Sequence, residues 1–238
     1  MANKKIHNLI TLVSKMVLYN LRIIFANKFI WFLAGAVIFW MGLSVIYVLE
    51  ADMPKMSDLY EIFMIFGLLL VFYPSVFGIQ NDQDARTIEI LFGIPDYRYK
   101  IWLVRIVLIF FIATLIMIVF TFFSSLLIVK FNFFIMSTQV MVPVLFLGML
   151  AFALSTVIKN GNGTAVVMII IGFLFLIMAD FLRRSQWNIF LNPFVPPYDM
   201  NEVSWEIISI KNRIILISGS VVFLLLALFN LQKREKFI

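Results

Sequence analysis

The sequence predicts an all-α membrane protein with six transmembrane helices, because its apolar residues run in long, unbroken stretches. Hydrophobic residues make up 63% of the 238 residues and charged residues only 13%, whereas a soluble domain is roughly half apolar and about a quarter charged. Continuous apolar runs favour helices over a β-barrel, whose strands would alternate apolar and polar residues. We expect one transmembrane domain over 29–238, preceded by a short helix over 1–28.

The segment 1–28 has apolar residues at intervals of three and four, which predicts an amphipathic helix lying in the membrane interface. Lys15 and Arg22 fall on its polar face. The same pattern would also suit packing on a cytosolic partner, and periodicity does not separate these two possibilities. A small-residue cleavage site is missing and the apolar residues are interrupted, so we do not expect a cleaved signal peptide.

A transmembrane helix needs about 20 mostly apolar residues. Six segments meet this requirement, at about 29–48, 62–79, 101–129, 140–158, 164–181 and 214–231. Pro74 lies inside the second segment and should kink it. That kink is either a tolerated packing feature or a pivot for movement. The stretch NGNGT over 160–164 predicts a turn between the fourth and fifth segments.

The basic residues indicate the orientation of these segments. Thirteen of the 19 Lys and Arg residues lie on the side that holds both termini and the stretch 80–100. Lys and Arg gather on the cytoplasmic side of membrane proteins, so we expect both termini in the cytoplasm. The net charge of +6 has the same explanation, and it therefore does not point to nucleic acid as a partner.

Several kinds of chemistry find no support in the sequence. There is no Cys and a single His, which excludes Cys nucleophiles and the usual multi-His metal clusters. A phosphate-binding loop of the G-x-x-x-x-G-K-[ST] type is absent, so we do not expect an ATP-hydrolysing enzyme. The centres of the apolar segments carry no ionisable residue, which disfavours an ion-driven carrier. Arg105 lies at a segment end, from which its side chain can reach the headgroup region.

The longest loop on the other side covers 182–213. Its proline residues forbid a continuous helix and its tryptophan residues favour the headgroup level: Trp187, Pro193, Pro196, Pro197 and Trp205. We expect a short interfacial helix after a cap at Asp199 or Asn201. The loop is either a plain connector with aromatic anchors or an external gate, and the sequence leaves both open.

The charged stretch QNDQDARTIEILFGIPDYRYK covers 80–100, between the second and third apolar segments. Asp82 and Asp84 lie at its start, where the positive end of a helix dipole favours acids. Apolar residues three and four positions apart give it a small apolar face, and Pro95 ends the helix. We predict a short amphipathic helix along the inner membrane surface that offers a docking surface to a cytosolic protein.

Four residues of this stretch share a recognisable spacing: Thr87, Glu89, Leu91 and Pro95. They resemble the cytoplasmic signature of type-2 exporter permeases of the ABC transporter superfamily. Arg98 matches the Arg that follows the Pro, and Arg105 stands where the family usually has Lys. Arg86 departs from the usual Gly. The motif covers 86–105, and the predicted topology extends the resemblance coarsely over the whole chain.

The resemblance implies that the chain forms half of a translocation pathway and pairs with a second copy or a related permease. A separate cytosolic ATPase would bind ATP and Mg²⁺, so no cofactor is expected in this chain. The helix over 80–100 would be the coupling helix, with ATPase contacts at Asp82, Asp84, Arg86, Thr87, Glu89, Ile90 and Leu91 and a hinge at Pro95 and Arg98.

The implied location is the bacterial cytoplasmic (inner) membrane. Two alternatives stay open. A permease-like subunit could perform mechanical, assembly or signalling work instead of export, and an ion-driven secondary carrier would need no ATPase.

Overall fold

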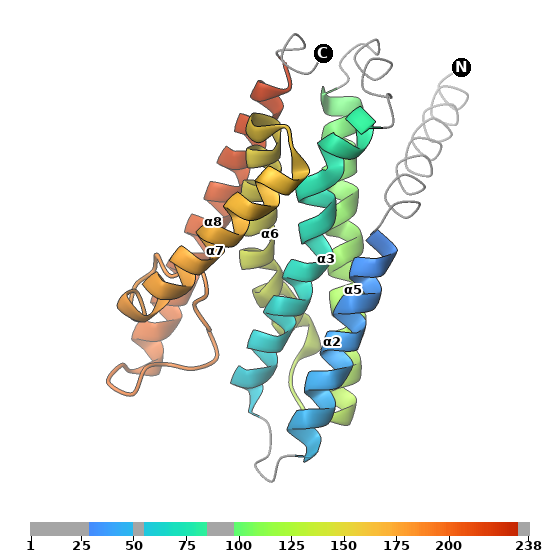
Figure 1. The fold of residues 1–238 in the computed structure, drawn as a ribbon. Coiled ribbons are helices and arrows are strands. Elements are labelled where there is room, and N and C mark those ends of the chain that lie inside the picture. The colour runs from blue at the N-terminus through green and yellow to red at the C-terminus, as the bar shows by residue number, and fades with distance from the viewer. Residues whose placement is uncertain (1–28, 50–54, 85–97, 233–238) are drawn as a thin grey trace, which may run out of the picture.

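The structure is a computed structural model that describes residues 29–49, 55–84 and 98–232. In these ranges the chain forms a bundle of helices and no β-strand (Figure 1). In chain order they are α2 (Phe29–Leu49), α3 (Met56–Asp84), the π-helical turn η1 (Arg98–Leu103), α5 (Val104–Leu127), α6 (Phe133–Ile158), α7 (Gly161–Phe181) and α8 (Glu202–Asn230).

Five of these helices, α3, α5, α6, α7 and α8, are long and apolar enough to cross a membrane. The helix α2 adds a shorter apolar stretch, Ile30–Ile46. The expected helical, multi-pass membrane protein is therefore confirmed at this level. The sixth span and the coupling helix stay predictions. The segment 1–28, with the expected interfacial helix, lies outside the described residues.

The helix α6 is the centre of the bundle, since it contacts α3, α5, α7 and α8. Gly148 in α6 allows this close approach: a Cβ atom there would lie 2.6 Å from both Phe110 of α5 and Val71 of α3. The largest buried cluster joins α3, α5 and α6 through side chains such as Phe63, Phe66, Leu70, Met117, Val140 and Val144. The helix α2 packs on the outside of α3.

The bundle has two ends, which Figure 1 shows at its top and bottom. The Asp82 end holds the last turn of α3, the start of α5, the α6–α7 turn and the last turn of α8. The loop end holds the starts of α3, α6 and α8, together with the non-helical residues 182–201. The described ends of the charged stretch, residues 80–84 and 98–100, thus lie at the end of the bundle opposite the long loop.

Polar caps make two helices longer than the apolar runs predicted. Asn132 accepts hydrogen bonds from the backbone N–H groups of Phe134 and Ile135, both at 3.1 Å, so α6 begins at Phe133 instead of 140. Asn201 accepts one from Ser204 at 2.8 Å and starts α8 at Glu202. The cap at Asn201 is confirmed. The prediction of a separate, short interfacial helix after it was wrong, because α8 continues to Asn230.

A turn joins α6 and α7 where it was predicted, but it consists of Lys159 and Asn160, because residues 161–164 of the NGNGT stretch form the first turn of α7. Lys159 adopts a left-handed conformation with φ 60°, and Asn160 caps α7 by accepting from the N–H of Gly163 at 2.9 Å. The N–H of Gly161 donates to the side-chain oxygen of Gln80 in α3. A Cβ atom on Gly161 would collide with Phe77 of α3, so the turn packs against α3 only because this residue is glycine.

Candidate functional site

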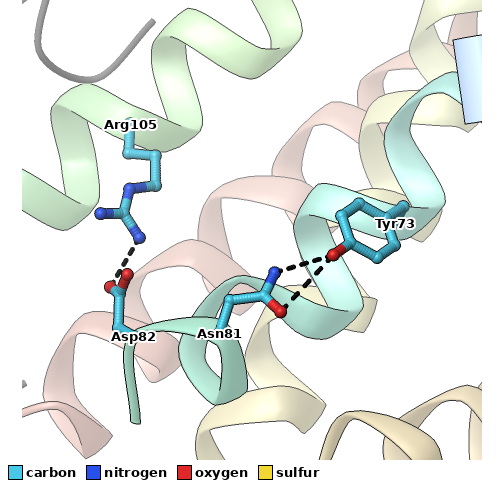
Figure 2. A network of polar contacts seen from close by, with 4 residues as sticks. All are labelled: Tyr73, Asn81, Asp82 and Arg105. Atoms are coloured by element: carbon cyan, nitrogen blue, oxygen red, sulfur yellow. Dashed lines mark hydrogen bonds and ion pairs between the residues drawn. The ribbon is translucent and has the colours of Figure 1, made fainter. Parts of the chain in front are cut away.

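A buried ion pair joins the two helices that flank the charged stretch. The last turn of α3 places Asp82 opposite the first turn of α5, where Nη1 of Arg105 lies 2.7 Å from Oδ2 of Asp82 (Figure 2). Both side chains are buried, with 7% of Asp82 and 5% of Arg105 exposed. A buried charge is expensive unless it is paired, so this contact holds the end of α3 and the start of α5 together.

The turn η1 provides a second contact for the same guanidinium. The Arg105 carbon Cζ lies 4.8 Å from the centroid of the Trp102 ring, and that ring is itself fully buried. A cation over an indole face is stabilised by the ring quadrupole, more so when water is excluded. Arg105 was expected to reach outward to the headgroups. It turns inward because Asp82 and Trp102 both lie on the bundle side.

Tyr73 and Asn81 form a separate polar contact on α3, beside the Asp82–Arg105 pair. The Asn81 side chain donates to the Tyr73 hydroxyl at 3.1 Å (Figure 2). The Tyr73 ring stacks on Phe32 of α2, with the ring centroids 4.9 Å apart. The Asp82 end therefore connects α2, α3, η1 and α5 through contacts that a shift of any one of them would disturb.

The residues predicted for ATPase contact divide into two groups. Asp82 is turned into the bundle and serves Arg105, because α3 continues past it to Asp84. Asp84 ends α3 and Arg98 begins η1. The others lie outside the described residues, as do those of the N-terminal helix: Arg86, Thr87, Glu89, Ile90, Leu91, Pro95, Lys15 and Arg22.

Pro74, the possible hinge, lies buried in the middle of α3, which is helical on both sides of it. A proline inside a helix removes one backbone hydrogen bond and favours a bend at that place. The hinge at Pro74 stays a prediction.

The loop end confirms that the prolines interrupt the helices, since residues 182–201 form turns and extended segments only. Trp187 is 61% exposed, as expected of an anchor at headgroup level. Trp205 is only 5% exposed, because it lies in the first turn of α8 and faces the bundle. Pro197 is buried, whereas Pro193 and Pro196 are half-buried.

A second buried arginine, Arg213 of α8, lies at the loop end. It is one of the six Lys and Arg residues that the charge balance assigns to the side opposite the termini. Its guanidinium donates four hydrogen bonds: from Nε to Gln139 at 2.8 Å, from Nη1 to Asn212 at 2.7 Å, and from Nη2 to the Tyr60 hydroxyl at 3.0 Å and the Leu191 carbonyl at 3.2 Å. No carboxylate of the described residues forms an ion pair with it.

Asn212 completes this network, since its side-chain nitrogen donates to the backbone carbonyls of Gln186 and Asn188, both at 2.8 Å. Arg213 and Asn212 therefore fix the long loop against α3, α6 and α8. The signal in the sequence was the polar group at 211–213 inside an otherwise apolar stretch. Its partners could not be read from the sequence, because Tyr60 is 153 positions away.

No family model matches this chain, and neither a curated protein nor a solved structure matches it. Among the residues that the structure describes, no group of three or more His, Cys, Asp or Glu is arranged to hold a metal ion. The described residues therefore include two buried guanidinium groups, those of Arg105 and Arg213, at opposite ends of a membrane-type bundle. Such groups can fix helices relative to one another and recognise acceptors or anions.

Proposed function

We propose that the chain is the membrane-spanning permease subunit of an ATP-driven transporter of the ABC superfamily. It crosses the membrane six times, with the Asp82 end and both termini in the bacterial cytoplasm. It pairs with a second copy or a related chain to form the pathway. A separate cytosolic ATPase docks on the stretch 80–100 and supplies the energy.

One observation carries this proposal: the Thr87–Glu89–Leu91–Pro95 spacing lies between two helices of membrane-crossing length, α3 and α5. The basic residues on the side of this stretch support its cytoplasmic position. A docking element must also pass its movement on to the membrane helices. The Asp82–Arg105 pair supports this second requirement, because it joins the end of α3, after which the stretch 85–97 begins, to the start of α5, which follows η1.

The proposed mechanism follows from this connection. ATP binding closes the ATPase dimer and displaces the docked stretch. Because the buried pair joins α3 to α5, the two helices move together as one body. Tyr73 then passes the displacement to α2 through its contact with Phe32. Packed helices respond to such a push by hinge or shear movements of whole elements.

The test begins with the full chain purified from its native membrane in mild detergent. We expect an ATPase subunit to co-purify and the chain to stimulate its ATP hydrolysis. The double variant Asp84→Lys/Glu89→Lys should abolish co-purification, because both charges at the docking stretch are reversed. Asp199→Lys is the matched control, since it reverses an exposed acid at the loop end and should leave co-purification unchanged.

The variant Asp82→Asn separates docking from coupling. It removes the buried charge that holds Arg105 and leaves residues 84–91 of the docking stretch unaltered. We expect the ATPase still to bind while its stimulation falls. Purification without any ATPase, combined with flux in vesicles that an ion gradient alone drives, would overturn the proposal in favour of a secondary carrier.

A further inference from the structure

The helix α7 is attached to the bundle mainly through its start. Its buried residues are Gly161, Thr164 and Met168, all of which lie in the half nearest the Asp82 end. In its apolar stretch only 11% is buried, whereas 56% of the corresponding stretch of α6 is. Figure 1 shows α7 leaving the bundle as it runs from the Asp82 end towards the loop end. The helix therefore has a fixed start and a loosely held remainder.

The start of α7 is fitted closely to the end of α3. The N–H of Gly161 donates to the side-chain oxygen of Gln80, and a Cβ atom on Gly161 would collide with the Phe77 ring. About two turns further along, Met168 packs with Val76 of α3 in a small buried cluster. The end of α3 thus holds the start of α7 beside the place where the buried ion pair holds α5.

Beyond its first two turns, the contacts of α7 are sparse. A Cβ atom on Gly172 would meet nothing within 4 Å. Phe175 is half-buried against a small apolar cluster, and the Ala179 carbonyl accepts a hydrogen bond from Asn188 at 3.4 Å, which is longer than usual. Apolar contacts have no directional preference, so they resist a small sideways movement of α7 only weakly.

A cavity of about 500 Å³ lies between the end of α7, the start of α3 and the long loop. We refer to it as the α3–α7 cavity. Ser57, Asp58 and Glu61 line it on α3, and Ala179 and Asp180 line it on α7. The two helices that touch at the Asp82 end are therefore apart at the loop end, and the space between them leaves room for movement of α7.

The turn between α6 and α7 has the properties of a hinge. It consists of Lys159 and Asn160, and Lys159 has a left-handed φ of 60° that residues with a Cβ atom rarely adopt. Hinges are a few residues at the ends of elements that absorb changes in backbone angles. Because α7 has 21 residues, it is about 31 Å long, and a rotation of about 10° at its start would move its end by about 5 Å.

We propose that α7 is a swinging arm, that Lys159 and Asn160 are its hinge, and that its tilt sets the width of the α3–α7 cavity. Gln80 is the positioning residue of this arm, because it ties the start of α7 to the end of α3. A displacement of that end of α3 changes the tilt of α7, and the length of the helix enlarges the movement at the loop end. This inference concerns the chain itself and does not depend on ATP-driven transport.

Distances between spin labels test the arm. The chain has no Cys, so labels can be attached at introduced Cys residues in the full chain in lipid nanodiscs, and double electron–electron resonance gives their distance distribution. Ile65→Cys in α3 is combined with Ile177→Cys near the end of α7, with Val166→Cys near its start, or with Val107→Cys in α5. All four positions are exposed, so labelling leaves the core intact.

The pair with Val107 gives the baseline width, since the buried ion pair joins α3 to α5. We expect the pair with Ile177 to have the widest distribution. Ile177 lies about three times as far along α7 from Gly161 as Val166 does, so the excess of its width over the baseline should be about threefold larger.

Two sets of variants test the tie and the hinge. Gln80→Leu removes the acceptor for the Gly161 N–H and should broaden the Val166 pair about twofold, whereas Gln80→Glu keeps an acceptor oxygen and should preserve the narrow distribution. Lys159→Gly widens the backbone freedom of the hinge and should broaden the Ile177 pair. Lys130→Gly, in the turn between α5 and α6, is the matched control and should leave that pair unchanged.

The proposal is overturned if the Ile177 pair is no wider than the Val107 pair, because α7 is then held along its whole length. An unchanged Val166 pair in Gln80→Leu would remove Gln80 from its positioning role. The comparison of the three pairs alters exposed positions only, so it decides the matter even if a hinge or tie variant fails to fold. No ATPase is present in this measurement, so its result is independent of the co-purification test.

Discussion

The two ends of the bundle each bury one arginine, but they compensate its charge in different ways. At the Asp82 end, Arg105 is paired with a carboxylate at 2.7 Å and covered by an indole ring. At the loop end, Arg213 is surrounded by neutral acceptors from α3, α6, α8 and the long loop. The first arginine forms one strong link between two helices, and the second forms a hub for four segments.

The way in which each arginine is compensated determines how each end responds to substitution. An ion pair is a two-body contact, so removing either partner leaves the other charge buried, whereas removing both leaves an apolar contact. A hub of neutral acceptors has no single opposite charge, and its acceptors keep part of their bonding when the arginine is lost. The Asp82 end should thus behave as a coupled pair and the loop end as a distributed network.

The largest effect is expected for Arg105→Leu. It leaves the Asp82 carboxylate buried without its guanidinium, which should lower the free energy of unfolding by about 3–5 kcal/mol. Unfolding in mixed micelles with increasing dodecyl sulfate measures this. The double variant Asp82→Leu/Arg105→Leu should recover most of the loss, because no uncompensated charge remains. Failure of the second substitution to recover any stability would show that the two residues do not act as a pair.

A smaller effect is expected for Arg213→Leu, about 1–3 kcal/mol by the same measurement. The Tyr60 hydroxyl still donates to the Leu191 carbonyl at 3.1 Å, so both stay paired. Gln139 and Asn212 each lose the donor to their side-chain oxygen. Lys211→Leu is the control, because Lys211 is the exposed neighbour on α8 and its loss should change stability little. A loss as large as that of Arg105→Leu would abolish the contrast between the two ends.

The sequence predicted the helices well and their contacts poorly, for a physical reason. Apolar runs report which residues avoid water, and they located the middle of α3, α5, α6, α7 and α8. Helix starts depend instead on single polar caps, so Asn132 and Asn201 lengthened α6 and α8 beyond those runs.

Contacts between helices depend on positions far apart in the chain. Asp82 and Arg105 are 23 positions apart, with the segment 85–97 and η1 between them. The charge of Asp82 predicted a position on the docking surface, and the charge of Arg105 predicted a side chain that reaches the headgroups. Only the packing of α3 against α5 turns the two side chains towards each other, and local sequence patterns carry no record of that packing.

The cap of α8 tests how far the loop-end network depends on where the helix starts. Asn201→Ala removes the acceptor for the Ser204 N–H and should cost about 1 kcal/mol. Asn201→Asp keeps an acceptor at a position that favours negative charge, and should retain or slightly increase stability. Because the Asp82 end does not contain this cap, adding Asn201→Ala to Arg105→Leu should give additive losses. A clear departure from additivity would indicate that the two ends are coupled through the bundle.

The smallest effect is expected at the exposed ion pair of the loop end, Arg184–Asp199, whose atoms Nη2 and Oδ2 lie 2.6 Å apart. Both side chains are largely exposed, at 66% and 45%, so water and salt screen their attraction. Arg184→Ala should therefore lower the free energy of unfolding by less than about 0.5 kcal/mol. Added salt should reduce that difference further while leaving the loss in Arg105→Leu nearly unchanged, because screening acts weakly on buried pairs. If salt reduced both losses equally, the Asp82–Arg105 pair would be accessible to water and its proposed role as a rigid link between α3 and α5 would fail.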